Sequence, residues 1–367
     1  MMIARRGSVA LVMVVLVAGL LPGVVYTAHA QAPVVIAQGL DNPRGLAFGP
    51  DGLLYVVEAG RGGTSTMCLP NATGPGTRCY GPSGAVTRIA GPGVQQRVLT
   101  GLPSLALPGG AEATGPHDLA FGFGTAFITV GSGGDPALLL PFKQAGINFG
   151  SLLIVNPTGT VSPLADAAAF EAASNPAGGP VDSNLYGIEV LATRAVMTDA
   201  GGNTLLQIDA SLALSTLAVF PSRQVTGPGG TPVNMEAVPT SIAEGPDGSL
   251  YVGELTGFPF PVGGARVYRV PAGGGIPVVV ATGFTNIIDI AVGKDGAAYV
   301  LEHDANGLLA PGVVGRLTKI GLFGSRTELA TGLLNTPGRI AIGPDNAIYV
   351  TTNSTSAGQG QVVRIPQ

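Results

Sequence analysis

The chain has 367 residues, of which 46 % are hydrophobic, so most of it is not disordered. Only 11 % are charged, and 58 glycines and 30 prolines supply many turns, a balance that favours an all-β fold. The net charge of −4, with no cluster of lysines and arginines, argues against nucleic acid as a partner.

The first thirty residues have the organisation of a signal peptide. Arg5 and Arg6 precede an apolar run over residues 8–25, and an Ala-x-Ala pattern at residues 28–30 supplies a cleavage site. An uncleaved membrane anchor is the alternative, because the run is just long enough to cross a bilayer. We expect cleavage after residue 30 and a secreted or periplasmic mature chain, residues 31–367, with no membrane contact.

Cys68 and Cys79 lie within one predicted loop. In an exported protein, two cysteines placed in this way are expected to form a local disulfide. Two buried thiols are the alternative. No further cysteine or histidine stands nearby, so the pair alone is not expected to hold a metal ion.

The mature chain repeats a unit of two strands joined by a tight turn. Four copies are clear: NPRGLAFGPDGLLYVVEAG from Asn42, VPTSIAEGPDGSLYVGELTG from Val238, NIIDIAVGKDGAAYVLEHD from Asn286 and TPGRIAIGPDNAIYVTTN from Thr336. Two degenerate copies begin at residues 115 and 184. Apolar residues alternate with period two in each copy, and two further strands follow each pair. The pattern predicts a single six-bladed β-propeller of four-stranded antiparallel blades.

The two ends of the mature chain are expected to meet. The last repeat ends on a third strand at residues 360–365 and lacks a fourth, while residues 33–39 resemble the fourth strands of other repeats. We therefore expect the N-terminal segment to pair with residues 360–365. This pairing would close the ring and remove two free sheet edges.

The turns between first and second strands are short, whereas the long insertions all fall on the opposite face of the propeller. These insertions cover residues 59–83, 101–116, 131–149, 165–185, 221–238 and 254–264. A short helix is expected within residues 163–175, where the letters ADAAAFEAA have helical propensity. Loops held by a rigid scaffold commonly carry function, so the long-loop face around the central channel is the expected working face.

Four repeats place an acidic residue at the end of the second strand. These residues are Glu58, Asp199, Glu254 and Glu302. A ring of carboxylates repels itself unless a cation or hydrogen-bond donors lie nearby. One interpretation is a site for Ca²⁺ or another divalent cation held by oxygen ligands. The other is pairing within each blade, with Arg266 reaching Glu254 and Arg316 reaching Glu302.

Further polar or aromatic side chains come from the starts of first strands and from the Pro-rich segment 254–264. The candidates for ligand binding are Arg44, Asn184, Tyr186, Asn286, Phe258 and Arg339. Phe258 either forms an apolar wall for a ligand or merely covers its blade.

The candidates for catalysis are His117, Asp118 and Asp289. His117 and Asp118 are adjacent in a strand and face opposite sides, so they act as a base and its orienting carboxylate only if a fold contact allows it. A histidine hydrogen-bonded to a loop carbonyl is the alternative that we favour. Asp118, Asp289 and Arg339 share one alternation parity, so we expect them to point the same way.

Several strings carry a resemblance to a known family. They are EATGPHDLAFG, GGPVDSNLYG, DAGGNTLLQIDA, AVPTSIAEGPDGSLYVGELTGFPFPVGGARVYRV and GFTNIIDIAVG. They resemble the ScyD/ScyE family of exported propellers, associated with biosynthesis of the sunscreen scytonemin, over essentially the whole mature chain. The resemblance implies a fold like that of NHL-repeat and gluconolactonase propellers, but it implies no established reaction.

Two functions from different classes remain open. The first is an accessory propeller whose long-loop face binds a small aromatic or sugar-like molecule or a partner protein. The second is a Ca²⁺-dependent hydrolase of lactones or esters, in which the cation polarises the carbonyl while His117 or a channel acid activates water. A quinone-dependent sugar dehydrogenase is a third alternative.

Overall fold

The computed structural model describes residues 32–71, 74–321 and 324–367. The expected signal peptide lies outside these residues. In the described part of the chain, no helix is both long and apolar enough to cross a membrane.

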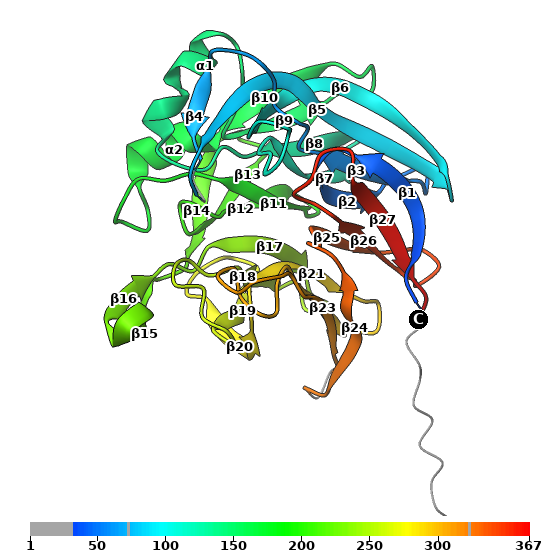
Figure 1. Cartoon of the computed structure of the whole chain (residues 1–367), viewed down its shortest axis with the longest axis vertical. Coiled ribbons are helices and arrows are strands. Elements are labelled where there is room, and N and C mark those ends of the chain that lie inside the picture. Colours follow the sequence, from blue (N-terminus) through cyan, green and yellow to red (C-terminus); the bar gives the residue numbers. More distant parts are fainter. Residues whose placement is uncertain (1–31, 72–73, 322–323) are drawn as a thin grey trace, which may run out of the picture.

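The chain folds into a six-bladed β-propeller of four-stranded antiparallel sheets, as predicted (Figure 1). From the channel outwards, blade 1 holds β2 (Pro43–Phe48), β3 (Leu54–Glu58), β5 (Thr77–Gly91) and β6 (Val94–Ala106). Blade 2 holds β7 (Pro116–Gly122), β8 (Thr125–Val130), β9 (Ser151–Val155) and β10 (Val161–Asp166). Blade 3 holds β11 (Leu185–Val190), β12 (Arg194–Asp199), β13 (Thr204–Asp209) and β14 (Leu214–Val219).

The second half of the chain builds the other three blades in the same order. Blade 4 holds β17 (Pro239–Glu244), β18 (Leu250–Glu254), β19 (Ala265–Val270) and β20 (Val278–Phe284). Blade 5 holds β21 (Ile287–Val292), β22 (Ala298–Glu302), β23 (Gly315–Ile320) and β24 (Arg326–Leu334). Blade 6 holds β25 (Arg339–Ile342), β26 (Ile348–Thr352), β27 (Gly360–Ile365) and β1 (Val34–Leu40).

The predicted closure of the ring is confirmed. Strand β1 runs antiparallel to β27, with Val34 opposite Arg364 and Leu40 opposite Gly360. Figure 1 shows the two strands side by side, blue against red. First and last strands therefore share one sheet, and the outer edge of β27 is covered.

The inner strands are in register around the ring. In five blades the first inner-strand residue pairs with the last residue of the second strand, as in Pro43 with Glu58 and Leu185 with Asp199. Because side chains alternate along a strand, equivalent positions form layers around the axis. One layer holds the third residue of the inner strand in blades 1 to 5 and the first residue of β25 in blade 6: Gly45, Asp118, Gly187, Ser241, Asp289 and Arg339. The residues that follow them are aliphatic and pack between the blades: Leu46, Leu119, Ile188, Ile242, Ile290 and Ile340.

Aromatic residues of the second strands connect neighbouring blades. Tyr349 of blade 6 meets Phe48 of blade 1 edge-to-face, with ring centroids 5.2 Å apart. Tyr55 of blade 1 meets Phe121 of blade 2 in the same way at 5.0 Å. The repeated aromatic residue of the sequence is thus a packing element between blades.

The insertions are more ordered than expected. Cys68 and Cys79 form the predicted disulfide, which joins β4 (Cys68–Pro70) to β5. Residues 77–83 and 101–106, expected in loops, instead extend the β5–β6 hairpin, because its strands continue to pair beyond the blade. The predicted helix is α2 (Ala167–Ser174), capped by the Asp166 carboxylate.

Other local elements were not foreseen. The insertion at 131–149 contains η1 (Pro136–Leu139) and α1 (Leu140–Gln144). A separate hairpin of β15 (Arg223–Thr226) and β16 (Pro232–Met235), with η2 (Pro228–Gly230) at its turn, projects from blade 4 at the lower left of Figure 1.

Candidate functional site

Glu302 and Glu254 are fully buried and paired with arginines. Both oxygens of Glu302 accept from Arg316, at 2.5 Å and 2.6 Å, which confirms the predicted pairing within blade 5. Glu254 accepts from Arg223 at 2.8 Å and 2.5 Å, so the prediction of Arg266 as its bonded partner is wrong. Arg223 is the first residue of β15, in the hairpin that precedes blade 4.

The other two members of the ring are also saturated by nearby donors. Glu58 accepts from Arg97 at 2.6 Å, from the Thr87 hydroxyl at 2.5 Å and from a backbone N–H. Asp199 has no arginine and accepts instead from the Ser183 hydroxyl at 2.7 Å and from two backbone N–H groups. Burial raises the pKa of Asp199, and these three hydrogen bonds oppose that rise.

This geometry does not fit the cation site that the sequence suggested. The oxygens of Glu58, Asp199, Glu254 and Glu302 face hydrogen-bond donors of their own blades, whereas Ca²⁺ needs several oxygens turned towards one point. Among the residues that the structure describes, no group of three or more His, Cys, Asp or Glu side chains is placed to hold a metal ion. The four carboxylates fasten strand ends and loops to their blades.

Asp118, Asp289 and Arg339 meet in the channel, on the shared side that their parity predicted. Arg339 contacts Asp118 through Nη2 and Asp289 through Nη1, the latter at 3.2 Å, and all three side chains are buried. Each carboxylate also accepts a backbone N–H from the next inner strand, at 2.9 Å. Burial lowers the pKa of Arg339 to about 9, so its guanidinium is still charged at neutral pH. We call these three residues the channel plug.

Two glycines make room for the plug. A Cβ atom on Gly45 would lie 2.5 Å from the Cα of Asp118, and one on Gly187 would lie 3.0 Å from Arg339 Nη2. The side chains of blades 2, 5 and 6 therefore reach across the channel over the bare inner strands of blades 1 and 3. The three plug side chains are nearly buried, and they line the inner end of a cavity that opens on the short-turn side.

His117 lies on the long-loop side of the plug and does not contact the carboxylate of Asp118. Its Nδ1 donates to the carbonyl of Leu185 at 3.1 Å, and Nε2 accepts from the Thr114 hydroxyl at 3.1 Å. The favoured carbonyl bond is thus present, although the carbonyl belongs to strand β11 and not to a loop. Burial, and then the charge of Arg44, lowers the pKa of His117 to about 3. With both nitrogens occupied, this imidazole is poorly placed to move a proton.

Arg44 and Tyr186 are neighbours beside His117. Tyr186 packs on the imidazole with ring centroids 4.5 Å apart. Burial raises the pKa of the Tyr186 hydroxyl, and the adjacent Arg44 guanidinium opposes that rise. Arg44 donates from Nη2 to the carbonyl of Ala113 at 3.0 Å, but its buried Nε has no partner. No carboxylate of the described residues forms a salt bridge with Arg44.

Asn184 adds an unused acceptor to this group. Its side-chain oxygen is buried without a partner, while its backbone N–H donates to Asp199. The same oxygen and the imidazole of His117 both flank Gly131, where an added Cβ atom would lie 2.4 Å and 2.2 Å from them. We call Arg44, His117, Asn184 and Tyr186 the mouth cluster.

The remaining candidates lie outside the mouth cluster. Asn286 is fully buried and joins two loops, donating to Leu255 O at 2.8 Å and accepting from Leu308 N at 3.2 Å. Phe258 is half exposed and meets Phe260 edge-to-face. No pattern in the sequence marks Arg97 and Arg223, because both come from segments outside the repeated strand pair.

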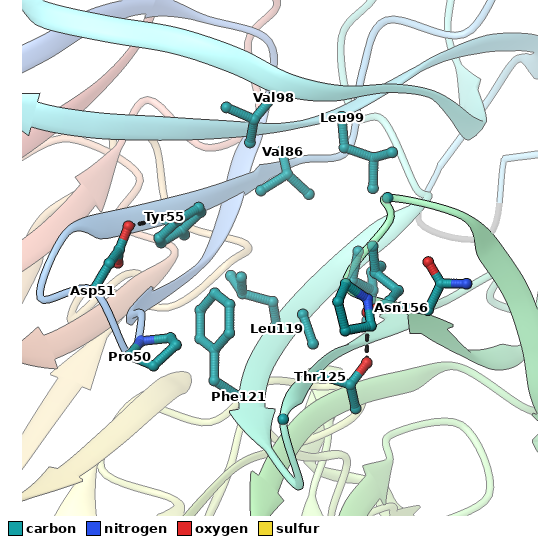
Figure 2. Close-up of a pocket in the computed structure, with 16 residues that line it drawn as sticks. Pro50, Asp51, Tyr55, Val86, Val98, Leu99, Leu119, Phe121, Thr125 and Asn156 are labelled. Atoms are coloured by element: carbon teal, nitrogen blue, oxygen red, sulfur yellow. Dashed lines mark hydrogen bonds between the residues drawn. The ribbon is translucent and has the colours of Figure 1, made fainter.

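Two cavities lie at the short-turn end of the propeller. The channel on the short-turn side holds a cavity of about 380 Å³, lined by inner-strand residues that include the three plug side chains as well as Glu189 and Glu244. Burial, reinforced by Glu244, raises the pKa of Glu189 to about 7. A second cavity of about 420 Å³ lies between blades 1 and 2 (Figure 2). The long-loop face is the expected working face, but these two cavities are further candidate binding sites on the opposite face.

Comparison with known proteins supports the fold. No protein-family profile and no curated protein sequence matches this chain. Among solved structures, a streptogramin B lyase is 13 % identical over 91 % of this chain and 96 % of its own, with a TM-score of 0.50. A protein proposed to be a gluconolactonase is 12 % identical over 92 % and 93 %, with a TM-score of 0.51. A protein of unknown function from Bacteroides thetaiotaomicron is 9 % identical over 91 % and 72 %, with a TM-score of 0.51. At this identity the likeness concerns the propeller fold alone.

Proposed function

We propose that this chain is an exported binding propeller of the ScyD/ScyE type, and that its mouth cluster binds a small anionic molecule. The observation that carries the proposal is that the Arg44 guanidinium has no carboxylate partner in the described chain, although its Nη2 donates to the carbonyl of Ala113. Its Nε is buried without a partner, next to the Tyr186 hydroxyl and on the long-loop side of the channel plug.

Most other arginines around the channel and its long loops provide a contrast. Arg78 is the exception, since its buried Nε also lacks a partner, but its Nη2 donates to the carbonyls of Pro70 and Ser132. Each of the following contacts at least one carboxylate: Arg61, Arg97, Arg223, Arg316 and Arg339. Arg44 forms no such pair in the described part of the chain. A buried N–H without an acceptor is unfavourable, and a bound carboxylate would supply the missing charge-assisted hydrogen bond.

The neighbours of Arg44 narrow the class of ligand. Tyr186 offers a hydroxyl, and Asn184 offers a buried side-chain oxygen that has no donor. A ligand that carries both a carboxylate and hydroxyl groups would meet all three side chains. Small sugar acids and hydroxylated aromatic acids have this composition, and they belong to the two ligand classes that the sequence suggested.

The hydrolase alternative has less support from the same residues. The four acids proposed as cation ligands are occupied by donors of their own blades, and both nitrogens of His117 are hydrogen-bonded. Asp118 and Asp289 are committed to Arg339 in the channel plug. With these contacts in place, none of the candidate catalytic residues named above is free to act as a base that activates water. We therefore assign a binding role to the mouth cluster, and not a catalytic role.

Calorimetric titration of residues 31–367 with acetate, 4-hydroxybenzoate and gluconate, in the presence of EDTA, tests the proposal. We expect gluconate or 4-hydroxybenzoate to bind with one site per chain, and Arg44→Gln to weaken that binding by about 10- to 100-fold. Arg364→Gln is the matched control, because Arg364 pairs with Asp345 on the surface of blade 6. Absence of binding by all three acids, or equal affinity in Arg44→Gln, would contradict the proposal. Hydrolysis of a lactone that requires added Ca²⁺ would favour the hydrolase instead.

A further inference from the structure

The cavity between blades 1 and 2 is a second feature that the mouth cluster does not explain. Figure 2 shows Val86 and Tyr55 of blade 1 facing Leu119 and Phe121 of blade 2, with Val98 and Leu99 of β6 above them. The cavity encloses about 420 Å³, which is within the range of sites for small organic molecules.

The walls of the cavity are apolar although the cavity is open to solvent. Val98, on strand β6, is 44 % exposed to solvent. Below it, Leu119 and Ile128 are almost fully buried and form the floor. Contact of an apolar surface with water is unfavourable. An apolar molecule that displaces this water therefore lowers the free energy of the system.

One aromatic ring is already oriented at the edge of the cavity. Tyr55 packs edge-to-face on Phe121 with centroids 5.0 Å apart, and its hydroxyl donates to the Asp51 carboxylate at 2.9 Å. These two contacts hold the rings of both blades in fixed positions. Fixed aromatic rings favour a planar aromatic guest, which can stack or meet them edge-to-face.

The rim supplies few polar groups and only one charge. Asn156 commits its side-chain oxygen to Thr158 and Thr160 in its own turn, so its amide hydrogens are the ones that can meet a guest. Thr125 donates to the carbonyl of Val155. Asp51 is the one charged residue of the lining and disfavours anions. The chemistry of this cavity is therefore opposite to that of the mouth cluster, which selects anions.

We propose that the cavity between blades 1 and 2 is a binding site for a small, uncharged, planar aromatic molecule of two or three rings. The site is independent of the proposed function, since it shares no residue with the mouth cluster and lies at the other end of the blades. Its guest contacts both blades and is expected to stabilise their interface.

N-phenyl-1-naphthylamine, a neutral fluorescent probe, tests this site in the mature chain. We expect saturable binding with enhanced fluorescence, weakened about tenfold or more by Val98→Glu, which places a carboxylate against the guest. Val94→Glu is the matched control, because Val94 lies on the same strand, is 61 % exposed and does not line the cavity. Its affinity should equal that of the unchanged protein.

A second variant keeps the test decisive if Val98→Glu disturbs folding. Ala126→Phe fills the cavity without adding charge, and it should reduce binding while the melting temperature stays near that of the unchanged protein. The proposal is overturned if the probe does not bind saturably, or if both Val98→Glu and Ala126→Phe bind it as tightly as Val94→Glu.

Discussion

At the scale of single residues, the buried charges of this propeller are divided between paired and unpaired groups. Arg339 and three of the ring carboxylates are paired with an opposite charge, and Asp199 has hydrogen-bond donors. Arg44, Arg78 and Glu171 form no salt bridge in the described chain. A buried charged group without an opposite charge has effects that can be measured. Its ionisation makes the stability of the fold depend on pH, or a ligand can supply the opposite charge.

Glu171 gives the clearest dependence on pH. It lies in α2 and is only 2 % exposed. Burial, followed by the charges of Asp199 and Asp182, raises its pKa to about 7 from an ordinary 4.5. Since the folded pKa is the higher one, this group does not oppose folding below about pH 4.5, and stability is lost as the pH rises towards 7.

Glu171→Gln should remove this loss of stability. Above pH 7 we expect the variant to be more stable than the unchanged protein by up to about 3 kcal/mol, and the difference should shrink as the pH falls towards 4.5. Melting curves between pH 5 and 8 measure it. Glu328→Gln is the control, because the Glu328 side chain is 58 % exposed. Curves that stay parallel at every pH would contradict the assignment to Glu171.

For the plug residues, the sequence predicted the side to which each side chain points but not the residues that it contacts. Parity along a strand fixes which way a side chain points, so Asp118, Asp289 and Arg339 were correctly placed on one side. That they bond one another depends on Gly45 and Gly187, which belong to other blades. Contacts between residues of different blades form only when the ring closes, so they cannot be predicted from a local sequence pattern.

At the scale of elements, β1 performs the function of a missing fourth strand. Its pairing with β27 buries Ile36, Ala37 and Leu40 against blades 6 and 1. The match between its letters and those of other fourth strands was enough to predict this pairing, because equivalent strands repeat the same alternation. The arginines of the insertions had no repeat to reveal them, and Arg223 therefore replaced the expected Arg266.

Deleting residues 31–39 should open the ring. We expect the melting temperature to fall by more than about 10 °C, because the deletion exposes the edge of β27 and part of the core between blades 6 and 1. Deletion of residues 31–33 alone is the control, since β1 begins at Val34. An unchanged melting temperature after the longer deletion would show that β1 does not close the propeller.

At the scale of the whole molecule, the channel plug separates two chemically different ends. On the long-loop side, the mouth cluster offers an unpaired guanidinium and polar groups. On the short-turn side, the cavities are lined by alanines and acids in the channel and by apolar side chains between blades 1 and 2. Export of the chain remains a prediction from residues 1–30, and a disulfide in the described chain agrees with an oxidising compartment.

We infer that Glu58, Asp199, Glu254 and Glu302 hold the blades together and do not hold a cation. The test is metal analysis of residues 31–367, purified without chelator, together with melting curves in EDTA and in excess Ca²⁺. We predict no stoichiometric metal and the same melting temperature in both solutions, because hydrogen-bond donors already occupy these carboxylates. One tightly bound equivalent of metal, with a melting temperature that falls on chelation, would show instead that these carboxylates hold a cation.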